Sequence, residues 1–463
     1  MTIYFGLELD DLSYPNPCLQ SGVHCFGEHG LLSFLESHLG LVGHPNNNAY
    51  LRIEQYRQAI MRHAEAHPQA FYQASFVADQ FAVATELLSR RDELLLTGWD
   101  FKVNENCPAR LKTLAEIEVL LIPCETKVEQ IESECIELAA GFSDRFTLII
   151  KQLAKRKQPI TKIYLNEPFE LLPLWYQRLF NLLKSQNVQI EQLIATKHAG
   201  DSDLIVLQKS LRKELERGQK HTLQKDGSLL ILKAKRETDA ASYLAKLLRH
   251  NPDYRPVCLI PEKNRALDND LIQEGLPSMG ILSASLARPS LQILKLITVF
   301  LWKPIDPFKI MEFVSLAVKP LEDELSNRIA AEMAQTPGMD GDGWRAMVAR
   351  YFDELDQKAQ TDKSISVKDV RQQFNFWFNR TRYDSSATVP KFEVIEIFNY
   401  LQNWSYRAFS DSNENNSSLL VLSEQAKRIK ELLETLPETQ LSNLELERIV
   451  RTIYEPSPVQ FQE

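Results

Sequence analysis

Asn166 and Glu167 form a polar pair at a place where a metal-dependent enzyme would put acidic ligands. They follow a short hydrophobic stretch, 160–165, whose pattern predicts a buried strand, and they precede a predicted amphipathic helix at 172–186. Mg²⁺ prefers carboxylate oxygens, and the neutral amide of Asn166 is a much weaker ligand. The pair therefore indicates a metal site that has lost its chemistry. An ordinary strand-to-helix turn is the alternative, with Glu167 and Glu170 placed near a helix N-terminus by the helix dipole.

Two glycines near the N-terminus have the interval of a phosphate-binding loop. Gly22 and Gly27 enclose four residues, and Glu28 and His29 follow. A working loop needs Lys and then Ser or Thr at those two positions, for the terminal phosphates and Mg²⁺. A carboxylate facing a polyphosphate is repulsive, so we expect no ordinary ATP binding here. A plain junction between a strand, a loop and a helix explains the same residues equally well, and both interpretations exclude an ATPase.

Several clusters of basic residues could contact the phosphates of a nucleic acid. They are Lys155, Arg156 and Lys157; Lys233, Lys235 and Arg236; and Lys263 with Arg265. Solvated helix faces and loop ends explain any single one of them as well. The aromatic run 374–378 could stack on bases, although a buried helix face is the expectation we favour.

Two further patterns carry no chemistry in our interpretation. His63 and His67 stand one helical turn apart and could bind a metal, but the order is H-A-E-A-H and the stretch is polar, which favours a surface pair. The acidic turn at 340–343 is too short for a calcium loop. We therefore predict no metal ion and no cofactor.

Composition bounds the class of protein. The chain has 463 residues, 44% hydrophobic and 25% charged, and a formal net charge of −9. This length predicts two to four domains. The acidic balance argues against a surface coated with nucleic-acid-binding charge, but it allows a local basic channel. Six cysteines without a C-x-x-C pair indicate a reducing, cytoplasmic location. We expect no membrane-spanning segment.

The hydrophobic rhythm changes twice along the chain. After a strand at 2–9, apolar spacing predicts helices over 31–41, 50–66, 76–96 and 127–157. Strands and helices then alternate from 160 to about 282, which is typical of parallel sheets with crossover helices. The strands are expected at 160–165, 188–195, 228–233 and 257–261, and the helices at 172–186, 203–217, 238–250 and 267–274. Gly275 stands at a helix C-cap position. From 288 to 453 nearly everything is predicted to be helical.

Residues 160–315 resemble the motor core of UvrD-type superfamily I helicases. The second motor domain of that family has a strand–turn–helix unit like 257–277, which ends here in Gly-Leu-Pro, and the flanking stretches 232–245, 288–297 and 302–309 are also similar. In the family, an Asp-Glu pair holds Mg²⁺ and positions the attacking water where Asn166 and Glu167 stand here. Because both nucleotide motifs are degraded, the chain is most similar to inactivated helicase subunits, the AddB-like and RecC-like proteins. Residues 22–36 and 71–99 also resemble AddB-like proteins.

The resemblance implies an α/β architecture with two helicase-like (RecA-like) parallel-sheet domains and large all-helical insertions. We expect the first domain at 1–30 and 105–220, the second from 221 to 287, helical insertions at 31–104 and 288–455, and the start of a further C-terminal part at 456–463. The implied function is a non-motor, DNA-binding scaffold portion of a bacterial helicase–nuclease (exonuclease V) that acts in double-strand-break repair and recombination. It would bind DNA and a UvrD-like motor subunit without hydrolysing ATP, and any nuclease would lie after residue 463. The alternative is a helical adaptor for protein partners built on an inactive helicase fold.

Overall fold

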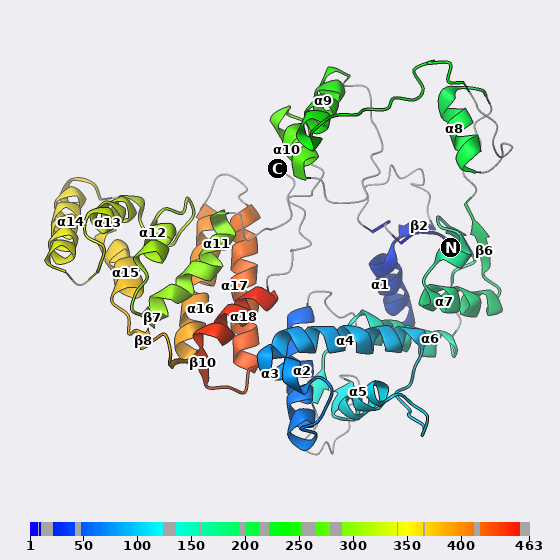
Figure 1. The fold of residues 1–463 in the computed structure, drawn as a ribbon, viewed down its shortest axis with the longest axis horizontal. Helices are drawn as coiled ribbons and strands as arrows, with labels where there is room; N and C mark the ends of the chain where they lie inside the picture. Colours follow the sequence, from blue (N-terminus) through cyan, green and yellow to red (C-terminus); the bar gives the residue numbers. More distant parts are fainter. Residues whose placement is uncertain are drawn as a thin grey trace. The chain divides into compact units, whose positions relative to one another are not determined.

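The described part of the chain is a mixed α/β structure, 64% helical, with a small parallel sheet of four strands. The structure is a computed structural model that describes residues 1–7, 9–10, 22–41, 48–123, 136–156, 159–193, 200–212, 222–251, 265–277, 289–339, 341–363, 366–411 and 417–453 (Figure 1). It divides into two compact units, unit 1 (Met1–Glu191 with Ala284–Pro456) and unit 2 (Gln192–Ser283 with Ser457–Glu463). Each unit is described by itself.

The parallel sheet of unit 1 has the strand order β2-β1-β5-β6. Its strands are β1 (Thr2–Phe5), β2 (Val23–Phe26), β5 (Lys162–Leu165) and β6 (Gln189–Gln192). In β1, Thr2 pairs with Val23 on one side and with Lys162 on the other. The strands predicted at 2–9, 160–165 and 188–195 are therefore present but shorter, while β2 was predicted as a loop.

Three helices bury their apolar faces together with this sheet. They are α1 (Glu28–Leu39), α6 (Phe142–Leu153) and α7 (Leu174–Ser185). Ile3 and Phe5 of β1, Leu35 of α1, Ile149 of α6 and Phe180 of α7 all belong to one core cluster. Aliphatic and aromatic burial of this kind contributes about 1.5–3 kcal/mol for each side chain, so the core fixes the strand ends from which the candidate site is built.

A helical segment lies between the second and third sheet strands in sequence. It comprises α2 (Ala49–Ala66), α3 (Gln73–Ala78), α4 (Gln80–Thr97) and α5 (Ala109–Val119), followed by the short parallel pair β3 (Leu121–Pro123) and β4 (Ile136–Leu138). The predicted helix at 76–96 is divided at Asp79, whose side chain caps α4 by accepting from the N–H of Ala82. The single helix predicted at 127–157 is wrong, because β4 and the extended Gly141 precede α6.

The C-terminal part of unit 1 is helical, as predicted. Its elements are α11 (Pro289–Leu296), η2 (Ile297–Leu301), α12 (Pro307–Val314), α13 (Asp323–Gln335), α14 (Asp342–Thr361), α15 (Val367–Phe378), α16 (Lys391–Asp411), α17 (Ser417–Thr435) and α18 (Asn443–Ile453). Short strands accompany them: β7 (Trp302–Lys303) with β8 (Tyr383–Asp384), and β9 (Thr388–Pro390) with β10 (Gln440–Ser442). Trp377 is fully buried and donates its indole N–H to the carbonyl of Pro320 at 3.0 Å.

The two helical segments, far apart in sequence, pack on each other inside unit 1. α17 contacts α2, and α18 contacts α4. Polar pairs cross the contact: the hydroxyl of Tyr50 donates to Glu431, and Arg57 pairs with Glu438 at 3.0 Å. Arg451 reaches Asp79 at 2.8 Å. The helical segments therefore form one continuous body.

Unit 2 contains α8 (Asp203–Leu211), α9 (Glu237–His250) and α10 (Arg265–Gln273). α9 and α10 share a small core with Ala245 and Leu271. Gly275 ends α10 with a left-handed φ of 72°, which confirms its predicted capping position. The strand predicted at 228–233 is wrong, because these residues form no strand and are mostly exposed. The strand predicted at 257–261 lies outside the described residues, so a second RecA-like sheet is not confirmed.

Candidate functional site

The carboxyl ends of three neighbouring strands bring the two predicted nucleotide motifs to one edge of the sheet. β1 lies between β2 and β5 in the sheet. From β1 the chain continues to β2 on one side, and later in the sequence it reaches β5 on the other side. Ligands of open α/β sheets bind at such a topological switch point. Here the N–H of Gly6, after β1, donates to the carbonyl of Phe26 at 3.2 Å, and the N–H of Asn166, after β5, donates to the carbonyl of Phe5 at 2.8 Å.

The carboxylate of Asp10 occupies the N-terminus of α1 at this edge. It accepts hydrogen bonds from the backbone N–H groups of Gly27 at 2.7 Å, His29 at 2.6 Å and Gly30 at 3.0 Å. A Cβ atom on Gly27 or on Gly30 would come within 2.5 Å of Asp10, so both glycines are needed for this close approach. N–H groups at a helix N-terminus are the donors that a bound phosphate would use. In this chain an internal carboxylate already uses them.

The predicted phosphate loop does not exist as a loop. The four residues between Gly22 and Gly27 are strand β2, in register with β1, and a paired strand cannot wrap a phosphate. Glu28 and His29 start α1, and the ring of His29 packs edge-on against Phe142 at 5.7 Å between centroids. Of the alternative interpretation, a junction between a strand, a loop and a helix, the helix is present as α1, but the residues taken as the loop are strand β2.

Asn166 and Glu167 stand at the end of β5, as predicted. The amide of Asn166 donates to Oε1 of Glu167 at 3.3 Å, which occupies one carboxylate oxygen. The other oxygen, Oε2, is buried and accepts no hydrogen bond from the described part of the chain. Asn166 also lies close to the backbone after β1, because a Cβ on Gly6 would be 3.0 Å from the Cβ of Asn166. The backbone after β1 therefore packs directly against Asn166.

Removing the Asp10 carboxylate should destabilise unit 1 by about 0.5–2 kcal/mol, the range for a lost helix N-cap. In Asp10→Ala, three N–H groups of α1 lose their acceptor. The free energy of unfolding in urea checks this. Asp100→Ala is the control, because its carboxylate pairs only locally with the exposed Lys102, and it should unfold like the unchanged protein. An equal loss in both variants would contradict the capping role of Asp10.

The predicted DNA-contact residues fall into both units. In unit 1, Lys155 is exposed, and Arg156 donates to the carbonyl of Leu39 at 2.9 Å, which ties it to the end of α1. In unit 2, the basic residues before α9 are exposed: Lys233, Lys235 and Arg236. The remaining candidates, Lys157, Lys263 and the side chain of Arg265, lie outside the described residues.

The other sequence candidates have mixed outcomes. The aromatic run 374–378 belongs to α15, and Phe374, Trp377 and Phe378 are buried, which confirms the expectation of a buried face. The prediction that His63 and His67 form a surface pair is wrong for His63. Its side chain is only 3% exposed, because Tyr72 and α5 cover it. His67 is exposed.

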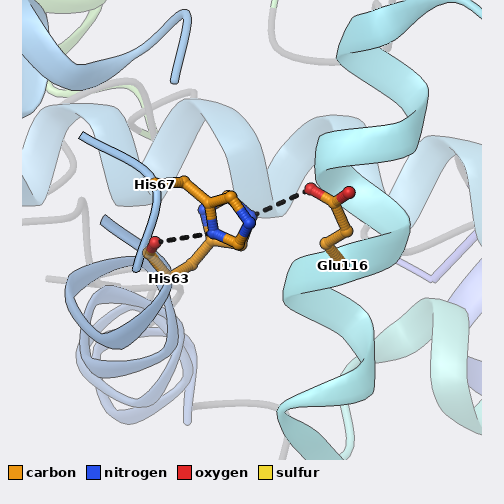
Figure 2. A group of neighbouring side chains, drawn as sticks. All are labelled: His63, His67 and Glu116. Carbon is orange, nitrogen blue, oxygen red and sulfur yellow. Dashed lines mark hydrogen bonds and ion pairs between the residues drawn. The ribbon is translucent and has the colours of Figure 1, made fainter. Parts of the chain in front are cut away.

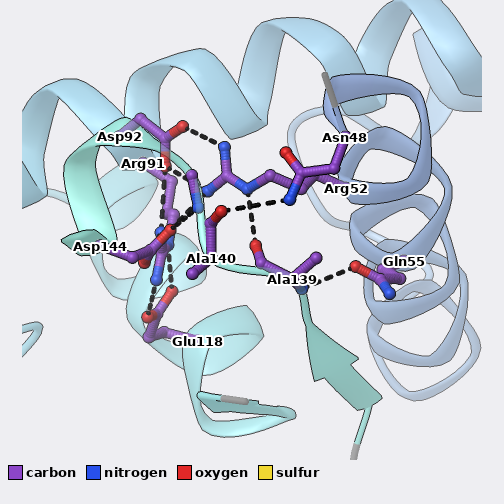
Figure 3. A network of polar contacts seen from close by, with 10 residues as sticks. Asn48, Arg52, Gln55, Arg91, Asp92, Glu118, Ala139, Ala140 and Asp144 are labelled. Atoms are coloured by element: carbon purple, nitrogen blue, oxygen red, sulfur yellow. Dashed lines mark hydrogen bonds and ion pairs between the residues drawn. The ribbon is translucent and has the colours of Figure 1, made fainter. Parts of the chain in front are cut away.

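A network of charges around the buried Arg52 and Arg91 joins α2, α4, α5 and α6, and no sequence pattern predicts it (Figure 3). Arg52 pairs with Asp92 and Asp144, both at 2.7 Å, and donates from Nε to the carbonyl of Ala139 at 2.8 Å. Arg91 pairs with Asp144 at 2.6 Å and with Glu118 at 2.7 Å. Its members come from four elements, so no local spacing could reveal them. Because carboxylates surround both guanidinium groups, the network is structural rather than a phosphate-binding site.

A cavity of about 430 Å³ opens beside this network. Arg91, Glu118 and Asp144 line it together with Phe101, Leu138 and Lys151. Both acidic and basic side chains line the cavity, so its charge favours neither an anion nor a cation.

Neither a scan against protein-family models nor a search of curated proteins finds a match. None of the helices in the described part of the chain is long and apolar enough to cross a lipid bilayer.

Proposed function

We propose that this chain is a non-motor, DNA-binding scaffold portion of a bacterial helicase–nuclease that processes double-strand breaks. In this proposal it belongs with the inactivated UvrD-like helicase subunits of the AddB and RecC kind, partners a UvrD-like motor subunit, and has a second RecA-like domain in unit 2. The observation that carries the proposal is the Asp10 carboxylate on the N–H groups of α1, at the switch point of the sheet. A nucleotide phosphate could bind these N–H groups only by displacing the Asp10 carboxylate.

The residues at the end of β5 and after Gly27 also support a chain without motor function. Asn166 replaces a carboxylate ligand, and no Lys follows Gly27 to reach a phosphate. We therefore expect no ATP hydrolysis with or without DNA. Steady ATP turnover that is abolished in Glu167→Gln would overturn this part of the proposal.

Exposed basic residues before α9 support the DNA-binding part. Lys233, Lys235 and Arg236 are exposed in an irregular stretch of unit 2 and are close enough in sequence for three cations to contact neighbouring phosphates. Each phosphate contact contributes about 0.9 to the slope of log K against log salt concentration on duplex DNA. Replacing all three with Ala should therefore weaken binding and lower that slope by about 2–3.

Fluorescence anisotropy with single-stranded, blunt duplex and forked DNA, titrated with salt, measures both quantities. The control is a triple variant, Arg90→Ala, Lys309→Ala and Arg345→Ala, which removes the same charge from exposed side chains that already pair with acids. It should bind like the unchanged protein. Equal losses in the two triple variants would show that net charge, not these three residues, governs binding.

A protein–protein adaptor is the second candidate, and one observation favours it. Leu230 and Ile231 are 68% and 77% exposed in a stretch that the sequence predicts as a strand. Exposed neighbouring apolar side chains are typical of surfaces that partners cover. No DNA binding at low salt would favour this function over the first.

A further inference from the structure

Two histidines and a glutamate meet at the C-terminal end of α2. His63 is on the last turn of α2, His67 is the residue that caps it, and Glu116 faces both from α5 (Figure 2). The two imidazole rings stack with centroids 4.2 Å apart, and Nε2 of His63 lies 3.1 Å from Oε2 of Glu116. One ligand atom from each of the three residues lies within 4.8 Å of the others.

Hydrogen bonds on the far side of each ring decide which nitrogen faces the cluster. Nδ1 of His67 lies 3.2 Å from the carbonyl oxygen of His63, which only accepts, so this nitrogen carries the proton and Nε2 keeps its lone pair. Nδ1 of His63 lies 2.7 Å from the hydroxyl of Tyr72, and that hydroxyl lies 3.4 Å from the carbonyl oxygen of Ile60. In the metal-free protein Nε2 of His63 donates to Oε2 of Glu116 at 3.1 Å, and Nδ1 accepts from Tyr72. A metal ion at Nε2 would take the place of that proton, and Nδ1 would then donate to the Tyr72 hydroxyl.

The three ligand atoms are close enough for one cation to use them together. Nε2 of His63 lies 3.1 Å from Oε2 of Glu116, and the His67 ring stacks on that of His63. A divalent metal ion can bind both imidazole nitrogens and the carboxylate at once, whereas the hydrogen bond between His63 and Glu116 joins only two of the three groups.

We propose that His63, His67 and Glu116 bind one divalent transition-metal ion of the zinc class, through the two Nε2 atoms and a carboxylate oxygen. Two imidazoles and one carboxylate are a usual ligand set for zinc, with bonds of about 2.0–2.2 Å. In a tetrahedral site, ligand atoms are roughly 3.3 Å apart, so the side chains must move closer together. His67 and Glu116 are exposed and can do so around the buried His63.

The surroundings provide the orientation that a metal site needs. Metal-bound histidines donate their second ring N–H to a carbonyl or another acceptor, which fixes the ring. The hydroxyl of Tyr72 does this for His63, and the His63 carbonyl does it for His67. Because the site is exposed on the His67 and Glu116 side, water can complete the coordination. The ion would join the end of α2 to α5, and this inference does not depend on the proposed DNA function.

Metal titration of the full chain, prepared without an affinity tag and stripped by chelation, tests the site. With Zn²⁺ we expect one ion per chain and a rise in melting temperature. His67→Ala and Glu116→Gln should each lose affinity by at least about 100-fold, and Tyr72→Phe, which removes only the orienting hydroxyl, by about 10-fold. His250→Ala is the matched control, because Nδ1 of His250 also bonds the carbonyl four residues earlier, that of Lys246, and it should bind like the unchanged protein.

Co²⁺ as a second probe separates this site from the cysteines. Bound by nitrogen and oxygen, it should show visible d–d bands without a thiolate charge-transfer band, and the d–d bands should be absent in His67→Ala. Melting curves of each variant without metal show that it is folded. The proposal is overturned if the unchanged protein binds no stoichiometric Zn²⁺, or if His67→Ala and Glu116→Gln bind it as tightly as His250→Ala does.

Discussion

Replacing Arg57 with alanine should lower the free energy of unfolding of unit 1 by about 3–5 kcal/mol, the cost of leaving a buried charge without its partner. Nε of Arg57 lies 2.6 Å from Oε2 of Glu54, and Nη2 lies 2.9 Å from Oε1, so the guanidinium grips the carboxylate with two bonds. The Arg57 side chain is 2% exposed and that of Glu54 is 0% exposed. Without Arg57, the buried Glu54 carboxylate loses the cation that pairs with it.

Arg57 also joins the two helical segments of unit 1. Its Nη2 bonds Glu438, after α17, at 3.0 Å, and its Nη1 bonds Gln80, at the start of α4, at 2.6 Å. The variant therefore weakens a contact between residues 381 positions apart. Because such a contact closes the fold rather than one helix, its loss should appear as a change in the whole unfolding transition.

Urea unfolding followed by tryptophan fluorescence measures this effect. All six tryptophans belong to unit 1, so the signal reports that unit alone. The free energy of unfolding of Arg57→Lys should lie between those of Arg57→Ala and the unchanged protein, because an ammonium keeps the charge but not the two-bond geometry. Arg90→Ala is the control, since Arg90 makes two ion pairs on an exposed helix face and should change stability little. If Arg57→Ala unfolds like Arg90→Ala, the buried pair carries no stability.

Local pattern predicted the helices well, because helical periodicity is recorded in neighbouring residues. The helix predicted at 50–66 is α2 (Ala49–Ala66), and that predicted at 238–250 is α9 (Glu237–His250). The error at 127–157 had a visible signal: Ile136 and Leu138 alternate with a polar residue, and Gly141 follows. An alternating triplet before a glycine is typical of a strand end, not of a helix interior.

The geometry of the candidate site depends on contacts between residues far apart in sequence, which no local pattern records. The strand before Asn166 was predicted, but Asp10 bonds residues 17 to 20 positions away. β2 was missed because its two flanking glycines resemble a loop, and only pairing with β1 makes Val23–Phe26 a strand. His63 lies in a polar stretch, so its burial depends on Tyr72 and on α5, which the sequence does not place beside α2.

Arg52→Met should destabilise unit 1 by about 3 kcal/mol or more at pH 7, and this loss should shrink in acid. Arg52 is 7% exposed in its side chain and holds Asp92 and Asp144 (Figure 3). Methionine keeps an unbranched side chain but is shorter than arginine, and it leaves Arg91 as the cation that pairs with Asp92, Asp144 and Glu118. The pH dependence then separates the electrostatic part of the effect from lost packing.

The direction of the pH effect follows from Asp92. Burial alone would raise the pKa of its carboxyl group, but the hydrogen bond from Arg52 and the charges of Arg52 and Arg91 outweigh burial and hold the pKa below its ordinary value. A lowered pKa in the folded state adds stability above the unfolded value of about 3.9, and that stability is lost as pH falls through the folded value. Urea unfolding at pH 7 and at about pH 3 should therefore show a smaller difference between Arg52→Met and the unchanged protein at the lower pH. Arg371→Met, which breaks an exposed pair with Asp356, should show little difference at either pH. A difference for Arg52→Met that is the same at both pH values would mean that lost packing, not the paired charges, causes the effect.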